Sequence, residues 1–329
     1  MESGKIDTTN LKELILNKLS TKRDDILVGP AVGEDSAVID FGEWVLIISS
    51  DPITGVNKGM GSLAVNVACN DLAANGAEII GIQQVLLFPP ELKEDEIKAI
   101  VEDINQAAEK LGIAILGGHT EITDLVRKPL VSCTAVGKAK KDSYVTSADA
   151  QIGDDIIVTK WAGYEGTAIL ANDFEAELLQ RGVGPEIIKE AQKFAEDISV
   201  VKEGQLGAKL KVNAMHDVTE GGLYGALCEL ATASEVGFEI EIDKIPLHSA
   251  TKKITSCFNL NPYKLISSGM MLIISSESDK LLKELAKAGI NATKIGKITN
   301  GQRIVKSEEG NIKLDKPPKD ELWRFLEEK

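Results

Sequence analysis

The segment SLAVNVACNDLAANGA at 62–77 constrains the fold more than any other part of the chain. Its small and apolar residues predict a helix over about 61–75 that is buried on most of its surface. Asn66, Asn70 and Asp71 nevertheless lie in the middle of this helix. A buried carboxylate is costly unless it is paired or coordinates a cation, so we interpret Asp71 as a candidate metal ligand. The alternative is an Asn and Asp pair that caps a loop from inside the core.

The other patterns mix strands and helices without regular βα alternation, which predicts an α+β fold and not a doubly wound sheet. The length of 329 residues suits two domains. A polar stretch at 140–149 interrupts the patterns, so we place an N-terminal domain at 1–145, a C-terminal domain at 150–318 and a terminal helix at 319–329.

Individual elements follow from periodicity, capping residues and turn residues. Strands are expected at 36–40, 44–49, 78–88, 113–116, 130–139, 151–160, 212–216, 237–242, 270–275 and 293–299. Helices are expected at 11–19 (capped by Thr8, Thr9 and Asn10), 61–75, 93–111, 164–180, 184–196, 199–210, 223–232, 248–257, 278–288 and 320–328.

Composition excludes several classes of partner. The net charge of −14 argues against nucleic acid, because its phosphate backbone would be repelled. No apolar run is long enough for a membrane helix and the first residues, MESGKIDTTN, are polar, so we expect a cytoplasmic protein with no membrane partner. The four cysteines and three histidines are scattered without a C-x-x-C pair, which predicts reduced, mostly buried thiols and no zinc site.

The common nucleotide-binding fingerprints are absent from the sequence. It contains neither G-x-x-x-x-G-K-[ST] nor a G-x-G-x-x-G between a strand and a helix. An acidic protein can still bind a nucleotide when Mg²⁺ bridges its carboxylates to the phosphates. Any nucleotide is therefore expected to be held by carboxylates and backbone groups.

Two acids meet at the open end of a predicted hairpin. A turn at 41–43 brings Asp35 near Ser49 across the ladder, and Asp51 follows two residues later. Two carboxylates held together repel each other unless a cation neutralises them, and Mg²⁺ prefers oxygen ligands. Asp35 and Asp51 are therefore candidate metal ligands. Two solvated acids at strand ends are the alternative, and the spacing alone does not decide between them.

Adjacent glycines follow a predicted strand in LGGHTEI at 116–122. Gly117 and Gly118 let backbone N–H groups approach an anion closely. Thr120 can bond a phosphate oxygen, and Glu121 can bind a metal. A tight turn with incidental polar residues is the alternative.

A similar junction occurs in MHDVTEGGLYGALCEL at 215–230, where a strand ends at His216 and Asp217 before a helix that follows two glycines. Helix N-termini bind anions, although an ordinary capped helix start has the same pattern. Further on, Ser267, Ser268 and Gly269 precede a strand. They fit either a substrate loop or a turn.

Five motifs cover nearly the whole chain: GEDSAV (33–38), SSDP (49–52), VACNDLAANGA (67–77), GGHTE (117–121) and HDVTEGGL (216–223). In this order they resemble the successive motifs of the aminoimidazole-ribonucleotide synthetase (PurM-like) superfamily. Its members include PurM, PurL, thiamine-monophosphate kinase, selenophosphate synthetase and HypE.

The resemblance implies a two-domain α+β PurM-like fold. The N-terminal domain would form a shared β-barrel in a homodimer, and the C-terminal domain would be an α/β sandwich. ATP with Mg²⁺ would bind in a cleft beside the barrel. Matched residue by residue, it implies metal ligands at Asp35, Asp51, Asp71 and Glu121, further nucleotide contacts at Lys5, Asn70, Gly117, Gly118, His119 and Thr120, and catalytic roles for Asp71, Glu121 and Asp217.

Within the superfamily, GGHTE (117–121) and NPYKLISSG (261–269) are most similar to HypE and its relatives. This implies ATP-dependent activation of a carbonyl, amide or similar oxygen by phosphoryl transfer. The acceptor would be a small molecule or protein-bound group, with a hydrogenase-maturation-type protein as a further partner. A kinase of the thiamine-monophosphate type and a non-catalytic ATP-binding scaffold remain alternatives.

One feature departs from HypE, which carries its carbamoyl group on a cysteine at its extreme C-terminus. This sequence has no cysteine after Cys257. Its last segment instead predicts an amphipathic helix, with Trp323, Phe325 and Leu326 available to dock on the body of the protein. We therefore expect the ATP site to be present without the thiocarboxamide chemistry.

Overall fold

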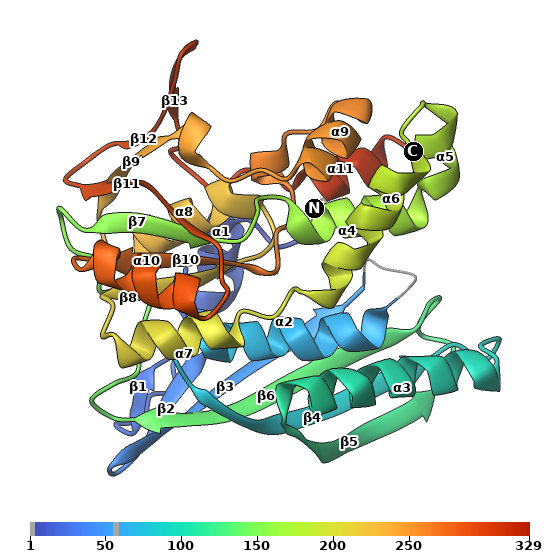
Figure 1. Ribbon diagram of the computed structural model, residues 1–329. Helices are drawn as coiled ribbons and strands as arrows, with labels where there is room; N and C mark the ends of the chain where they lie inside the picture. The colour runs from blue at the N-terminus through green and yellow to red at the C-terminus, as the bar shows by residue number, and fades with distance from the viewer. Residues whose placement is uncertain (1–3, 55–58) are drawn as a thin grey trace.

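The helix predicted from its small apolar residues is α2 (Met60–Ala74), and it packs against both sheets of the fold. The computed structural model describes residues 4–54 and 59–329. In Figure 1 a six-stranded sheet forms the lower layer, α2 and α3 (Glu94–Leu111) lie above it, and the second sheet lies above α2.

The first sheet has the strand order β1-β2-β3-β6-β4-β5. All neighbours are antiparallel except β4 and β5, which run parallel. Residues of β6 alternate between buried and half-buried over nearly its whole length, as expected when one face packs on helices. The strands are β1 (Ile26–Val28), β2 (Ala37–Phe41), β3 (Trp44–Ile53), β4 (Glu78–Phe88), β5 (Ala114–Ile122) and β6 (Leu130–Lys140).

The second sheet has the order β13-β12-β9-β11-β7-β10-β8. Its strands β7, β8 and β10 are buried at every position, because α8 packs on one face and α7 with α10 on the other. The elements are β7 (Asp155–Thr159), α7 (Val201–Lys209), β8 (Ala214–Val218), α8 (Gly222–Ala233), β9 (Gly237–Glu241), β10 (Met270–Ser275), α10 (Ser278–Lys287), β11 (Ala292–Thr299), β12 (Arg303–Ser307) and β13 (Gly310–Lys313).

A group of helices lies beside the second sheet, toward the upper right of Figure 1. It contains α4 (Tyr164–Asp173), α5 (Glu175–Gln180), α6 (Pro185–Gln192), α9 (Ser249–Cys257) and α11 (Glu321–Glu327). Phe325 of α11 is buried, with its ring 5.0 Å from Phe174 and 4.7 Å from Phe258. The terminal helix therefore docks on the body as the sequence predicted.

Small residues allow α2 to contact α3 and α7 closely. A Cβ on Gly61 of α2 would lie 2.4 Å from the carbonyl oxygen of Ile100 in α3. A Cβ on Gly204 of α7 would lie 2.0 Å from the carbonyl oxygen of Ala73 in α2. Larger side chains at either glycine would push the helices apart, and the prediction of a buried α2 is confirmed.

Several expected elements differ from the structure. The helix predicted at 11–19 starts instead at Thr8, because Asp7 accepts hydrogen bonds from the N–H groups of Thr9 and Asn10. None of its residues is buried, and the chain continues as a π-helix (Leu11–Ile15) and then a 3₁₀-helix (Leu16–Lys18). The helix predicted at 164–180 breaks at Phe174, whose ring packs into the aromatic group around α11.

Two β features were also misjudged. The strand predicted at 113–116 continues to Ile122, so Gly117 and Gly118 lie inside β5 and not in a loop. The hairpin of β12 and β13 was not predicted, because its polar sequence RIVKSEEGNIK has weak strand alternation.

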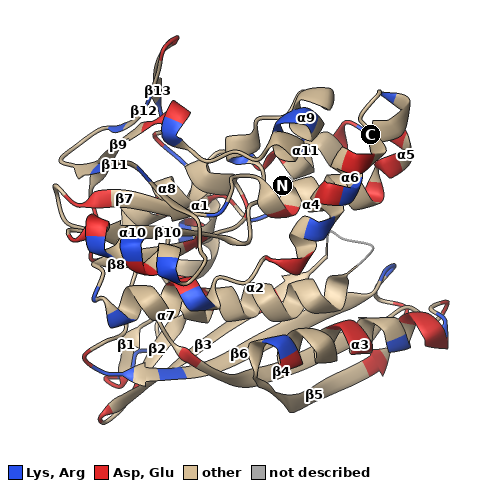
Figure 2. Ribbon diagram, in the orientation of Figure 1, with Lys and Arg blue, Asp and Glu red and all other residues tan. Residues whose placement is uncertain are grey.

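The α+β class is confirmed, with one mixed sheet in each half of the chain. Charged residues of both signs are interspersed along exposed helices such as α3 and α10 (Figure 2). Among residues 4–54 and 59–329, no helix is both long and apolar enough to cross a membrane.

Candidate functional site

Four aspartates come together where α2 meets β8, and we call them the aspartate cluster. Asp35 lies in the loop before β2, Asp51 on β3, Asp71 on α2 and Asp217 on β8. Asp71 and Asp217 are only 8% and 2% exposed. The first sheet and its helix thus supply three of these acids, and the second sheet supplies the fourth.

Burial and mutual repulsion dominate the electrostatics of the aspartate cluster. Burial, followed by the charges of Asp217, Asp51 and Asp35, raises the pKa of Asp71 well above its ordinary value. Burial and then the charge of Asp35 raise the pKa of Asp217 in the same way, against an opposing effect of His216. Ionising Asp71 and Asp217 together is therefore favoured by a nearby cation.

Ser49 connects two members of the cluster. Its hydroxyl lies 2.9 Å from the carbonyl oxygen of Asp35 and 2.5 Å from Oδ2 of Asp71. Ser49 stands two residues before Asp51 on β3, so both side chains point to the face that α2 covers. The hairpin register differs by one residue from the expected one, since Ala37 pairs with Ile48, but the Ser49 side chain still contacts Asp35.

Unpartnered oxygens show what the cluster could bind. Oδ2 of Asp51 and Oδ2 of Asp217 are buried and make no hydrogen bond among the described residues. In the same part of the chain, no three Asp, Glu, His or Cys side chains are arranged as a complete ligand set for one ion. The unpartnered oxygens of Asp51 and Asp217 fit Mg²⁺, which is usually bound through one or two carboxylates together with substrate phosphates.

His216 is an imidazolium buried between two carboxylates. Its Nδ1 lies 2.8 Å from Oδ2 of Asp35, and its Nε2 lies 3.2 Å from Oε2 of Glu229. Burial alone would lower the pKa of His216, but Asp35 and Glu229 hold it well above its ordinary value. His216 therefore donates from both nitrogens and fixes the orientation of Asp35.

Lys5 extends this network to the N-terminal segment. Its Nζ lies 2.9 Å from Oε1 of Glu229, and its backbone N–H donates to Oε1 of Glu220 at 2.6 Å. Burial opposes ionisation of Glu229, yet the hydrogen bonds and charges of His216 and Lys5 lower its pKa to about 2. The N-terminal segment is thus held against α8, next to the residues that support Asp35.

The GGHTE motif lies apart from the aspartate cluster within one chain. Asp51, Cys133, Gln84 and Gly118 stand in register across β3, β6, β4 and β5, which places Gly118 about 14 Å from Asp51. Because side chains alternate along a strand, His119 and Glu121 point to the opposite face of the sheet. There His119 Nε2 lies 3.3 Å from Glu121 Oε2.

Consequently Glu121 does not share a metal ion with Asp35, Asp51 and Asp71 inside a single chain. Thr120 and Glu121 lie on the exposed edge strand, where they are accessible to a molecule or a second subunit. Their roles in nucleotide binding stay predictions.

Asn70 has a different environment from the one its motif implied. It is fully buried, its Nδ2 donates to the carbonyl of Ile198 at 2.8 Å, and its Oδ1 accepts from the N–H of Val200 at 2.9 Å. Both polar groups of its amide are therefore used to attach the segment before α7 to α2. In this arrangement Asn70 positions the two domains beside the aspartate cluster.

The sequence also left the role of 267–269 open. Ser267 is fully buried; its hydroxyl accepts from the N–H of Gly163 and donates to the carbonyl of Leu265, both at 2.7 Å. Ser267 thus stabilises a turn. The neighbouring N–H of Ser268 donates to Oε2 of Glu165 at 3.3 Å.

The sequence motifs gave no role to three residues of this site: Ser49, Glu229 and His216, whose imidazole pairs with two carboxylates. A histidine directly before the strand-end Asp217 was the available signal, since a buried histidine needs partners for both nitrogens. Glu229 lies thirteen positions further on, and only the packing of α8 on β8 brings it to the imidazole.

Known proteins share this arrangement of domains. The N-terminal domain of AIR synthase related protein matches residues 33–139, and the C-terminal domain of the same family matches residues 151–307. A Methanocaldococcus jannaschii protein named for hydrogenase expression and formation is 29% identical over 98% of this chain and 96% of its own length. A selenide, water dikinase of Methanococcus maripaludis is 29% identical over 94% of this chain and 96% of its own.

Solved structures agree on the fold. HypE in the HypE-HypF complex superposes with a TM-score of 0.77 at 19% identity, covering 94% of this chain and 99% of that one. AaThiL complexed with AMPPCP and TMP superposes with a TM-score of 0.73 at 21% identity, covering 93% and 96%. With both family domains matched in order, this chain belongs to the AIR synthase related protein family.

Proposed function

We propose that this protein is an ATP- and Mg²⁺-dependent enzyme that transfers the γ-phosphoryl group of ATP to an oxygen of its acceptor. The observation that carries the proposal is the aspartate cluster, with its buried and unpartnered carboxylate oxygens at the junction of the two domains. Its relatives by sequence include a selenide, water dikinase, and HypE has been solved in complex with ATP.

Each part of the site has a role in this proposal. One or two carboxylates of the aspartate cluster would bind Mg²⁺ together with the phosphates of ATP, and the ion would neutralise charge on the transferred phosphoryl group. His216 donates to Asp35 and fixes its orientation. Lys5 would hold the N-terminal segment beside the phosphates, because its ammonium group already pairs with Glu229.

Product analysis tests the reaction class. The protein is incubated with Mg²⁺, ATP and a metabolite extract, and the phosphorus-containing products are followed by NMR and mass spectrometry. Activation of an amide or carbonyl oxygen yields ADP and inorganic phosphate with a dehydrated or ligated product, which is the expected result. ADP with a stable phosphorylated metabolite would assign a kinase instead, and ATP binding without ADP formation would assign a scaffold.

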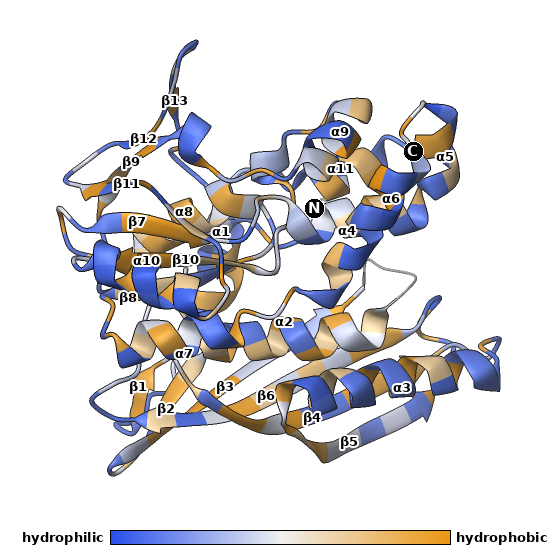
Figure 3. Cartoon of the chain, viewed as in Figure 1, coloured by the Kyte–Doolittle hydropathy of each residue, from blue (hydrophilic) through white to orange (hydrophobic). Residues whose placement is uncertain are grey.

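We also propose that a second copy of the chain packs on the outer face of the first sheet, the face opposite α2. Ile80 and Val85 of β4 and Leu116 of β5 are 42%, 39% and 51% exposed. Each of the two strands contains one Asp, Glu, Lys or Arg residue, Glu78 in β4 and Glu121 in β5 (Figure 2). Most residues of β4 are hydrophobic (Figure 3). An open sheet edge and apolar face of this kind favour association.

The homodimer prediction has a direct test. Light scattering at micromolar concentration should give twice the 35.3 kDa chain mass. Val85→Glu places a charge on the exposed apolar face and should shift the protein to the monomer mass, whereas Glu43→Gln on the hairpin turn should leave the dimer unchanged. A wild-type protein at 35.3 kDa would contradict the shared-barrel arrangement.

The burial of the cysteine thiols predicts that the protein does not carry out the carbamoyl chemistry of HypE. Cys69, Cys133 and Cys228 are fully buried, and burial raises the pKa of Cys133 and of Cys228 to about 12. A thiol must be accessible and ionised to be a nucleophile. Only Cys257 is partly exposed, at the end of α9.

We therefore expect no added mass after incubation with carbamoyl phosphate, ATP and the hydrogenase-maturation carbamoyltransferase. Intact-mass spectrometry followed by peptide mapping makes the measurement. Working HypE in the same mixture is the positive control. One carbamoyl group mapped to any of the four cysteines would assign the HypE reaction to this protein.

A further inference from the structure

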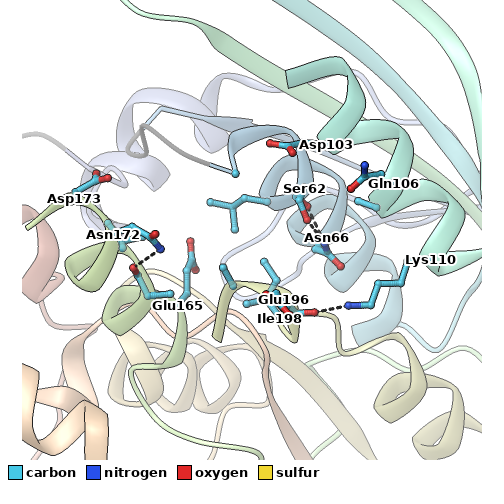
Figure 4. Close-up of a pocket in the computed structure, with 16 residues that line it drawn as sticks. Ser62, Asn66, Asp103, Gln106, Lys110, Glu165, Asn172, Asp173, Glu196 and Ile198 are labelled. Atoms are coloured by element: carbon cyan, nitrogen blue, oxygen red, sulfur yellow. Dashed lines mark hydrogen bonds between the residues drawn. The ribbon is translucent and has the colours of Figure 1, made fainter. Parts of the chain in front are cut away.

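A cavity of about 330 Å³ lies between the two domains, away from the aspartate cluster. Helices α2 and α3 form one side, and α4 with the segment 195–198 forms the other (Figure 4). We call it the interdomain cavity. Its volume lies in the range of small-molecule sites in proteins.

The charges around the interdomain cavity are mostly negative. Four carboxylate residues line it, on α3 (Asp103), α4 (Glu165 and Asp173) and the segment after α6 (Glu196). Lys110 is the one basic residue among the lining residues that the structure describes, and its Nζ donates to the carbonyl of Glu196. An anionic ligand would therefore be disfavoured.

Two side chains that are more than nine-tenths buried present acceptor oxygens to the cavity. Glu165 is 5% exposed, and its Oε2 accepts a 3.3 Å hydrogen bond from the N–H of Ser268. Asn66 is 9% exposed and donates through Nδ2 to the carbonyl of Ser62 at 2.8 Å. Its Oδ1 accepts no hydrogen bond among the described residues, so both lining side chains have acceptor capacity left for a ligand.

The position of the cavity relates it to the phosphoryl site. Asn66 precedes Asp71 by five residues on α2, which is about 7.5 Å along the helix axis. Asn70, between them, fixes Ile198 of the cavity wall to the same helix. A molecule in the cavity would thus contact both domains within reach of a nucleotide at the aspartate cluster.

We propose that the interdomain cavity binds the acceptor substrate and that this acceptor carries a cationic nitrogen group, such as an ammonium, amidinium or guanidinium. Glu165 and Asn66 accept its N–H donors, and Asp103 adds negative charge at the α3 side. The assignment as acceptor site rests on the proposed function, whereas the binding of a cation rests on the cavity alone.

Burial raises the pKa of Glu165 to about 7, so near neutral pH this carboxyl is partly protonated. A bound cation favours the carboxylate form and drives the proton into solution. Binding is therefore expected to release a fraction of a proton at pH 7. Calorimetry in two buffers of different ionisation enthalpy detects that release.

Agmatine, which carries a guanidinium and an ammonium group, is a suitable probe for the full-length protein. Calorimetry without ATP should show saturable binding of agmatine and none of glutarate, an anion of similar length. Glu165→Gln should weaken agmatine binding by about tenfold or more, since it removes a buried charge. Glu91→Gln, an exposed acid outside the cavity, should leave it unchanged.

A steric variant separates the cavity from the acidic surface. Ala195 is exposed at the cavity wall, so Ala195→Trp should fill the space and abolish binding while circular dichroism shows the fold intact. Agmatine binding that survives both Glu165→Gln and Ala195→Trp would place the cation elsewhere and overturn the proposal.

ATP binding by the wild-type protein, measured in parallel, distinguishes the two failures. If ATP binds with Mg²⁺ but agmatine, putrescine and spermidine all fail to bind at roughly 10 mM, the inference is wrong and the proposed function stands. If agmatine binds in the cavity but ATP does not bind, the cation site is correct and the acceptor role is overturned with the proposed function.

Discussion

Asp71→Asn is expected to reduce Mg²⁺-dependent ATP turnover by about 100-fold or more and to leave the fold intact. The substitution keeps the shape of the side chain, so the contact from the Ser49 hydroxyl can persist. It removes a negative charge from the buried centre of the aspartate cluster. The loss of a ligand charge should weaken both the binding of the Mg²⁺–ATP complex and the stabilisation of the transferred phosphoryl group.

The same substitution is expected to raise the melting temperature in the absence of Mg²⁺. The folded-state pKa of Asp71 is raised above its unfolded value, so the stability it contributes is present at low pH and is lost as the pH rises through the folded-state pKa. At neutral pH the buried charge is therefore a cost that Asn does not have. Scanning calorimetry should show a gain of about 2–4 °C for each kcal/mol recovered.

Asp142→Asn is the matched control, because Asp142 is exposed in the segment that connects β6 to β7. It should change neither the ATP turnover nor the melting temperature. A lower melting temperature with unchanged ATP binding in Asp71→Asn would assign Asp71 to packing or capping. That outcome would remove the centre of the proposed site.

His216→Gln is expected to destabilise the protein by about 3–5 kcal/mol. The imidazolium is 3% exposed and pairs with Asp35 and Glu229, so its loss leaves two buried carboxylates without their shared cation. Orientation of Asp35 is lost with it. ATP affinity should therefore fall together with stability.

The pH dependence of this destabilisation follows from both partners. The pKa of His216 is raised, so its contribution is complete below the ordinary value of 6.5 and is lost as the pH rises through the folded-state pKa. The pKa of Glu229 is lowered to about 2, so its contribution is complete above the ordinary value of 4.5 and is lost as the pH falls toward 2. The difference between wild type and His216→Gln should be widest between pH 4.5 and 6.5.

Chemical denaturation across that pH range measures the effect, with His119→Gln on the exposed strand β5 as the control. The control should match wild type at each pH. A His216→Gln variant within about 0.5 kcal/mol of wild type would show that the two ion pairs contribute nothing to folding.

The central helix and its acid could be predicted because their signal is local. Small apolar residues on every side of Asp71 already required a buried carboxylate, and the structure places that side chain beside Asp51 and Asp217. The hairpin itself was also a local signal, but its register is one residue away from the expected one, because the turn holds two residues and not three. Asp35 and Ser49 are still in contact through the Ser49 hydroxyl.

Long-range arrangement was harder to predict. The motif at 117–121 was interpreted as a loop, but pairing of β5 with β4 extends the strand through both glycines and carries Glu121 to the opposite face from Asp51. Nothing in the local sequence of GGHTE shows which strand lies next to it. Likewise, Asn70 was expected at the nucleotide, and only the docking of the segment before α7 shows that its amide bonds Ile198 and Val200.

Partners for a buried charge depend on tertiary packing too. The sequence places His216 beside Asp217 but says nothing of Glu229 and Lys5, which reach the imidazole and its carboxylate from α8 and from the N-terminal segment. The break at Phe174 has the same origin, because the aromatic contacts with Phe258 and Phe325 override a continuous helical pattern.

The central claim is that buried aspartates hold ATP through Mg²⁺, and titration calorimetry of ATP into the full-length protein tests it most directly. We predict saturable binding in the presence of Mg²⁺, loss of that binding in EDTA, and weak binding of Mg²⁺ alone, because the cluster is not a complete ligand set without phosphate oxygens. Equal ATP affinity with and without Mg²⁺, or no ATP binding in either condition, would contradict the assignment.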